Sequence, residues 1–95
     1  MEKSIREIVG ERVVRLRRRA HLTQPELAAK ADFSLTTLNR VERAHQSLYI
    51  EGLVALAQAL GTTPDYLLGF AEEPERDSPR PQTRRRQPGA TVGAV

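Results

Sequence analysis

The chain contains no cysteine, and its only two histidines, His21 and His45, lie far apart in the sequence. Without cysteine it can form neither disulfide bonds nor a Cys-based zinc site, and thiol catalysis is excluded as well. Two isolated histidines are too few for a metal cluster. We therefore expect no metal ion and no other cofactor, and the lack of cysteine favours a reducing compartment.

Long apolar runs and catalytic motifs are also missing. No stretch approaches the ~20 apolar residues of a membrane span, and the N-terminus lacks an uninterrupted signal-like core. These absences predict a cytoplasmic protein with no membrane partner. The sequence also has no Gly-rich phosphate loop, no clustered pair of carboxylates and no nucleophile beside a plausible base. We predict that the protein is not an enzyme.

The composition of the chain changes after Phe70. Residues 71–95 hold four of the six prolines, and their only large apolar residues are Val92 and Val95. Such a segment cannot bury enough apolar surface to offset its ordering entropy. We predict a folded domain over residues 1–70 and a disordered Pro/Arg-rich tail over 71–95. This tail either solubilises the chain or grips DNA phosphates through its run "TRRRQ".

Apolar residues spaced by threes and fours predict that the first seventy residues are helical throughout. Capping boxes open the first two helices, and Gly61 ends the fourth. The expected helices cover about 5–20, 24–31, 35–43, 50–60 and 64–69. Five helices with short links predict a compact all-α fold. Because Gly10 interrupts the first helix, we expect its first turns to be separate or frayed.

The second and third helices are short, carry their own N-caps, Thr23 and Ser34, and are joined by a short turn. This spacing is typical of a helix-turn-helix, whose second helix lies in the major groove of DNA. On the third helix Leu38 and Val41 point toward the core. The opposite side gathers Thr36, Asn39, Arg40 and Arg43. No acid interrupts this side, and these side chains suit base edges and phosphates. A merely solvated face is the alternative, which the paired caps and the turn disfavour.

The segment "ERVVRLRRRAHLTQPELAAKADFSLTTLNRVERAHQSLYIEGLVALAQALGTTPDYLLG" closely resembles the phage repressor and Cro type of helix-turn-helix domain, also called the xenobiotic-response-element type. The resemblance covers about Gly10 to Gly69 and is most specific in "LTQPELAAKA", "LNRVERA" and "LVALAQALGTTPDYLLG". It implies a five-helix repressor-like DNA-binding domain with its motif at about 23–43. The implied function is a sequence-specific transcriptional regulator of double-stranded DNA, a homodimeric repressor on a palindromic operator.

The resemblance also implies roles for individual residues. Gln24 is expected to contact a DNA phosphate and to brace the neighbouring residue that reads a base. Arg43 is expected to bind the DNA backbone. Arg17 and Glu42 match a pair that forms a salt bridge in relatives. The whole set expected at DNA is Thr23, Gln24, Ser34, Leu35, Thr36, Thr37, Asn39, Arg40 and Arg43.

Apolar side chains near the fifth helix exceed what a seventy-residue domain needs for its core. We therefore expect a dimer surface there; the alternative is that these residues complete the core of the monomer. The residues concerned are Tyr66, Leu68 and Phe70.

The sequence departs from the family pattern at four positions. Asp32 stands in the turn where relatives usually have glycine, and Asp tolerates the left-handed conformation. Ala44 replaces the usual glycine after the third helix, which puts the end of that helix in question. Tyr49 takes a Ser or Thr cap position, so the fourth helix is weakly capped. Leu35 holds a place often given to a polar reader, where it either touches a thymine methyl or packs.

Two other functions are compatible with the same fold. In an antitoxin, the main partner is a toxin protein, and the tail is the segment that folds onto it. A restriction–modification controller shares the size and the fold. Neither alternative changes the expected DNA-binding residues.

Overall fold

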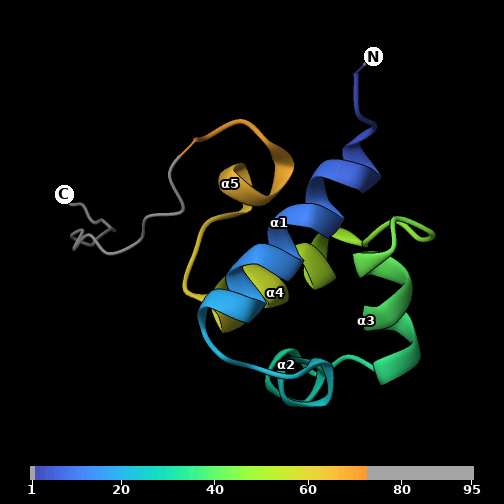
Figure 1. The fold of residues 1–95 in the computed structure, drawn as a ribbon, viewed down its shortest axis with the longest axis vertical. Coiled ribbons are helices and arrows are strands. Elements are labelled where there is room, and N and C mark those ends of the chain that lie inside the picture. The colour runs from blue at the N-terminus through green and yellow to red at the C-terminus, as the bar shows by residue number, and fades with distance from the viewer. Residues whose placement is uncertain (1, 73–95) are drawn as a thin grey trace, which may run out of the picture.

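The computed structural model describes residues 2–72, and over this range the chain forms five α-helices and no strand (Figure 1). The helices are α1 (Ile5–Arg19), α2 (Gln24–Ala31), α3 (Leu35–Glu42), α4 (Ile50–Leu60) and α5 (Pro64–Leu68). The predicted all-α, five-helix fold is confirmed. Most of the predicted tail, residues 73–95, lies outside the described residues.

Local chemistry explains where each helix begins. Capping boxes open α1 and α2: the hydroxyl of the cap accepts a backbone N–H, and the carboxylate three residues later accepts the backbone N–H of the cap. Single side-chain caps open α3 and α5. Only Tyr49, before α4, makes no such bond, as its side chain predicts. The boundaries of these short helices therefore follow from residues within a few positions of each end.

Residues in the left-handed (αL) backbone conformation follow the last turns of several helices. Asp32 ends α2 with φ 60° and ψ 43°, and glycines take this conformation after α4 and α5. Ala44, just beyond α3, has φ 63°, and its N–H donates to the carbonyl of Val41 at 3.1 Å. Ala44 thus takes the conformation that glycine adopts most easily, and α3 ends as the family pattern implies.

Replacing Ala44 with glycine is expected to raise the free energy of unfolding by about 0.5–1 kcal/mol. The left-handed conformation costs an L-residue roughly 1–2 kcal/mol, and the extra freedom of glycine in the unfolded chain cancels part of that gain. The urea midpoint of the circular dichroism signal measures the change. Asp32→Gly is the matched control, with a smaller gain expected because Asp tolerates this conformation better. A lower midpoint for Ala44→Gly would contradict the interpretation.

The core forms where α1, α4 and α5 meet the α2–α3 pair. Its buried residues are Val9, Val13, Leu16, Leu27, Ala28, Ala31, Leu38, Val41, Leu56, Ala57, Tyr66 and Leu67. They come from all five helices, so no helix can move without exposing core surface. In particular, Leu38 and Val41 fix the orientation of α3 and leave its opposite face outward.

The expectation that Gly10 breaks the first helix is wrong, because α1 runs unbroken through it. Gly10 is buried where α1 crosses α3. A Cβ atom on it would lie 2.8 Å from the carbonyl oxygen of Val41 and 2.9 Å from that of Glu42. Both distances are below normal contact, so a glycine is needed here for the close approach of the two helices.

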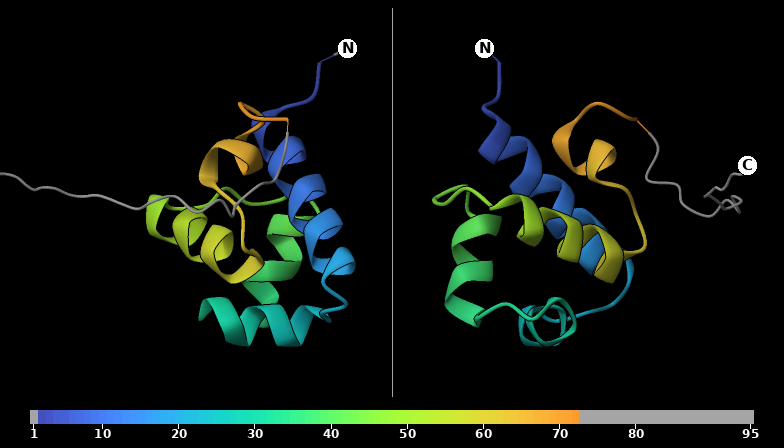
Figure 2. Two further views of the ribbon diagram at one scale, coloured as in Figure 1. Left: turned by 90° about the vertical axis from the view of Figure 1, so that its left-hand side faces the viewer. Right: turned by 180° about the vertical axis from the view of Figure 1, so that it is seen from behind.

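Arg12 of α1 holds α5 and Ala71, which lies three residues beyond the end of that helix. Its guanidinium lies 4.4 Å from the centre of the Tyr66 ring, and Nη1 donates to the carbonyls of Tyr66 at 2.9 Å and Ala71 at 2.8 Å. Arg15 adds a 3.3 Å hydrogen bond to the Tyr66 hydroxyl. Since α3 packs on another side of α1, α5 lies away from the helix-turn-helix (Figure 2).

Candidate nucleic-acid interface

The turn between α2 and α3 sets the relative position of the two helices. Phe33 N–H donates to the carbonyl of Ala28 at 2.8 Å, and Ser34 Oγ accepts the N–H of Thr37 at 3.0 Å. Together with the left-handed Asp32, these bonds close the short turn without a glycine. The result is a helix-turn-helix in which α3 lies at the edge of the molecule (Figure 1).

The outward face of α3 carries polar and basic side chains. Thr36, Arg40 and Arg43 are exposed, and Thr37 and Asn39 are half-buried. The acid of this helix, Glu42, lies on the inner side against α1. An uninterrupted face of hydroxyl, amide and guanidinium groups suits the acceptors and donors of base edges and the oxygens of phosphates.

Leu35 begins α3 and is 48% exposed. Its side chain is therefore not a member of the buried core. An exposed leucine beside Thr36 offers an apolar contact of the kind that a thymine methyl makes. The exposure favours this contact over the alternative that Leu35 packs.

Thr23 and Ser34 lie at the exposed N-termini of α2 and α3. Their hydroxyls are engaged as caps, because Thr23 Oγ1 accepts the N–H of Glu26 and Ser34 Oγ that of Thr37. The first turn of α3 nevertheless keeps the backbone N–H groups of Leu35 and Thr36 next to the positive end of its helix dipole. In α2 only the N–H of Gln24 remains, because Pro25 has none and the cap engages that of Glu26. Such termini attract phosphate oxygens.

A buried ion pair joins α1 to the inner side of α3. Arg17 Nε donates to Glu42 Oε2 at 2.6 Å, and Arg17 Nη2 donates to Glu42 Oε1 at 3.1 Å. Only 13% of the Arg17 side chain and 4% of the Glu42 side chain are exposed. The structure thus brings together the two residues that the resemblance pairs. Arg17 also donates to the carbonyl of Leu22 at 2.9 Å, which ties the loop before α2 to the same pair.

Gln24 extends this pair to the outward face. Its Nε2 donates to Glu42 Oε1 at 2.8 Å, and its Oε1 lies 3.5 Å from Asn39 Nδ2, which donates to it. The amide of Asn39 keeps Oδ1 and a second N–H for other partners. Those are the groups that an asparagine uses on adenine.

Sequence reasoning missed the bond between Gln24 and Glu42. A signal for it was available, because Glu42 follows Asn39 by three positions on the same helix. A side chain of α2 that reaches Asn39 also reaches Glu42, since residues three apart are neighbours on a helix surface. The cluster formed by Arg17, Glu42, Gln24 and Asn39 connects the core of the domain to its outward face.

The predicted dimer residues do not share one surface. Tyr66 is only 2% exposed and belongs to the core of the monomer, which removes it from the expected interface. Leu68 is partly buried against the core, whereas Phe70 is 76% exposed. The ring of Tyr66 is buried because the guanidinium of Arg12 covers it. Helix periodicity cannot predict this contact between α1 and α5.

Two further findings concern metal binding and membrane spans. Within residues 2–72 no group of three or more His, Cys, Asp or Glu side chains could hold a metal ion. Among the helices of this same range, none is long and apolar enough to cross a membrane.

The chain is similar to transcriptional regulators in sequence and in structure. A model of the helix-turn-helix domain family matches residues 8–68. The uncharacterized HTH-type transcriptional regulator y4dJ of Sinorhizobium fredii is 41% identical over 59 residues, which are 62% of this chain and 77% of that protein.

Two solved structures share the fold. The c2 repressor of P22, crystallised with a synthetic operator, has a TM-score of 0.63 and 32% identity, and the match covers 66% of this chain and 96% of the repressor. The clp gene regulator ClgR of Corynebacterium glutamicum has a TM-score of 0.67 and 28% identity over 72% of each chain. With the α2–α3 geometry above, these matches show that the chain belongs to the helix-turn-helix family of DNA-binding regulators, in its phage repressor type.

Proposed function

We propose that the protein is a repressor that binds a palindromic operator in double-stranded DNA as a homodimer. The observation that carries this proposal is the acid-free outward face of α3, held in place by the buried pair of Arg17 and Glu42. The similar c2 repressor of P22 was crystallised with a synthetic operator, which supports operator DNA as the ligand of this protein. In this proposal residues 1–70 form the DNA-binding domain.

The outward residues divide into base readers and backbone contacts. Thr36, Asn39 and Arg40 read base edges, with Leu35 on a thymine methyl and Thr37 at the edge of this set. The backbone contacts come from the two helix N-termini and from the end of α3. They are Thr23, Gln24, Ser34 and Arg43.

A homodimer would present two copies of α3 to successive major grooves ~34 Å apart, which requires half-sites about one helical turn apart. Phe70, exposed two residues after α5, is the apolar side chain that we place at the dimer surface. Self-association there would cover it and add burial to a small domain.

Selection of binding sites from a random duplex pool at a stated salt concentration tests the proposal. We expect an enriched palindrome with half-sites about one turn apart, and an affinity that falls steeply with salt. An enriched single half-site would contradict the homodimer. Failure to enrich any sequence would contradict sequence-specific binding.

Arg40→Ala is expected to weaken binding to the selected operator by about 1–3 kcal/mol and to relax the choice at one base pair. Arg40 is exposed at the middle of the outward face, where a guanidinium can bind guanine with two hydrogen bonds. Titration against a panel of single-base operator variants measures both effects. Arg15→Ala, which removes the same charge beside Tyr66, is the control. A uniform loss over the whole panel would show that Arg40 holds only phosphate.

A further inference from the structure

An open groove of 620 Å³ lies between the first turn of α1 and the α3–α4 connection, residues 43–49. Three basic side chains line it: Arg6 from α1, and Arg43 and His45 from the connection. The acid at this groove is Glu7, whose carboxylate accepts the N–H of Ser4 at 2.8 Å in the capping box. The groove therefore combines two guanidinium groups with one carboxylate that is already engaged.

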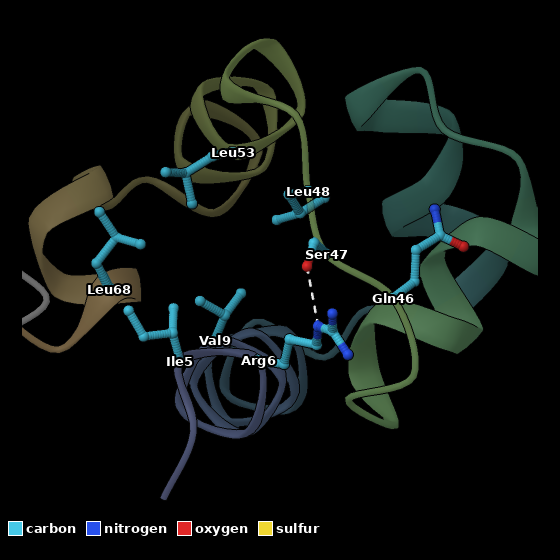
Figure 3. Close-up of a pocket in the computed structure, with 8 residues that line it drawn as sticks. All are labelled: Ile5, Arg6, Val9, Gln46, Ser47, Leu48, Leu53 and Leu68. Atoms are coloured by element: carbon cyan, nitrogen blue, oxygen red, sulfur yellow. Dashed lines mark hydrogen bonds between the residues drawn. The ribbon is translucent and has the colours of Figure 1, made fainter.

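Arg6 is held over the connection by a single hydrogen bond. Its Nε donates to Ser47 Oγ at 2.9 Å, which orients the guanidinium (Figure 3). Within residues 2–72 no partner accepts from Nη1 or Nη2, so four N–H groups remain for a ligand. The connection itself is anchored, because Leu48, next to Ser47, packs against the core.

The groove continues the outward face of α3. Arg43 follows the last residue of α3 and also lines the groove, so one side chain belongs to both. The first turn of α1 adds the positive end of a 15-residue helix dipole. A guanidinium with free N–H groups that shares a groove with a second guanidinium matches the paired oxygens of a phosphate diester.

We propose that Arg6, together with Arg43, binds a phosphate of the operator backbone beyond the bases read by α3. This inference rests on the proposed function, because it adds a contact to the same DNA. The contact carries no base information and fixes the register of α3 in the groove. It extends the protein surface in contact with each half-site from the helix-turn-helix to the start of α1.

Arg6→Gln tests the proposal, and the affinity for the selected operator is measured between 50 and 200 mM salt. Loss of one phosphate contact should lower the salt slope by about 0.9 and weaken binding by about three- to tenfold at the low-salt end. The loss should be equal for an unrelated duplex. Arg15→Gln, which removes the same charge near α5, should keep the wild-type slope.

Single neutral methylphosphonates placed along the flanks of the operator identify the phosphate. One position should weaken the wild type and leave Arg6→Gln unaffected. The proposal is wrong if no such position exists, if the slope is unchanged, or if free inorganic phosphate at equal ionic strength abolishes the difference between the two proteins. If the wild type itself binds no duplex, the proposed function fails instead. Thermal melting by circular dichroism checks that the variant folds, as expected for an exposed side chain.

Discussion

Glu42→Ala is expected to lower the free energy of unfolding by about 3–5 kcal/mol, because it leaves Arg17 charged and buried without its partner. Only 13% of the Arg17 side chain and 4% of the Glu42 side chain are exposed, and two hydrogen bonds join them. Gln24 Nε2 loses its acceptor at the same time. For a domain of about seventy residues, this loss is comparable to the whole stability. Urea denaturation followed by circular dichroism measures it.

The double variant Arg17→Met/Glu42→Leu separates the ion pair from the space that it fills. Apolar residues of similar volume remove both charges together, so the double variant should recover most of the stability lost by the single one. Its affinity for DNA should nevertheless be lower than that of the wild type, because Gln24 would no longer be held beside Asn39. A cost below 1 kcal/mol for Glu42→Ala would contradict a buried pair at this position.

Gly10→Ala is expected to destabilise the domain by about 2–3 kcal/mol, although alanine is the better helix former. A Cβ atom on Gly10 would approach two backbone carbonyl oxygens of α3, and backbone can move only if the helices separate. The separation would loosen Val41 and disturb the Arg17–Glu42 pair. The midpoint of urea denaturation measures the change.

Gly52→Ala in α4 is the matched control. The nearest atoms to its added Cβ are Cζ of Phe33 at 3.0 Å and Cδ2 of Leu48 at 3.3 Å, which are ends of side chains that can shift. The gain in helix propensity should offset most of this crowding, so we expect a change below about 1 kcal/mol. Equal losses at both glycines would contradict the close approach of α1 and α3.

The features that sequence predicts well are those decided within a few residues. Helix starts follow from hydroxyl caps and their carboxylate partners, and the orientation of α3 follows from Leu38 and Val41. The identity of the outward residues follows from the same periodicity. These signals need no knowledge of which helices pack together.

The features that sequence did not predict depend on contacts between distant helices. Helix propensity makes Gly10 a weak point, whereas its packing against α3 makes it a requirement. Tyr66 was expected on the surface because nothing near it in the chain indicates that Arg12 covers its ring. The bond between Arg6 and Ser47 joins residues 41 positions apart. Such contacts are visible only once the helices are in place.

The way Arg12 fastens Ala71 to α1 decides how the protein can be labelled. A fluorophore or affinity tag attached after Glu72 starts on the α5 side of the domain, away from α3. A tag attached before Ser4 starts beside the groove of Arg6 and Arg43. A fusion joined directly after Glu72 therefore leaves the DNA-facing surface free for binding assays and imaging.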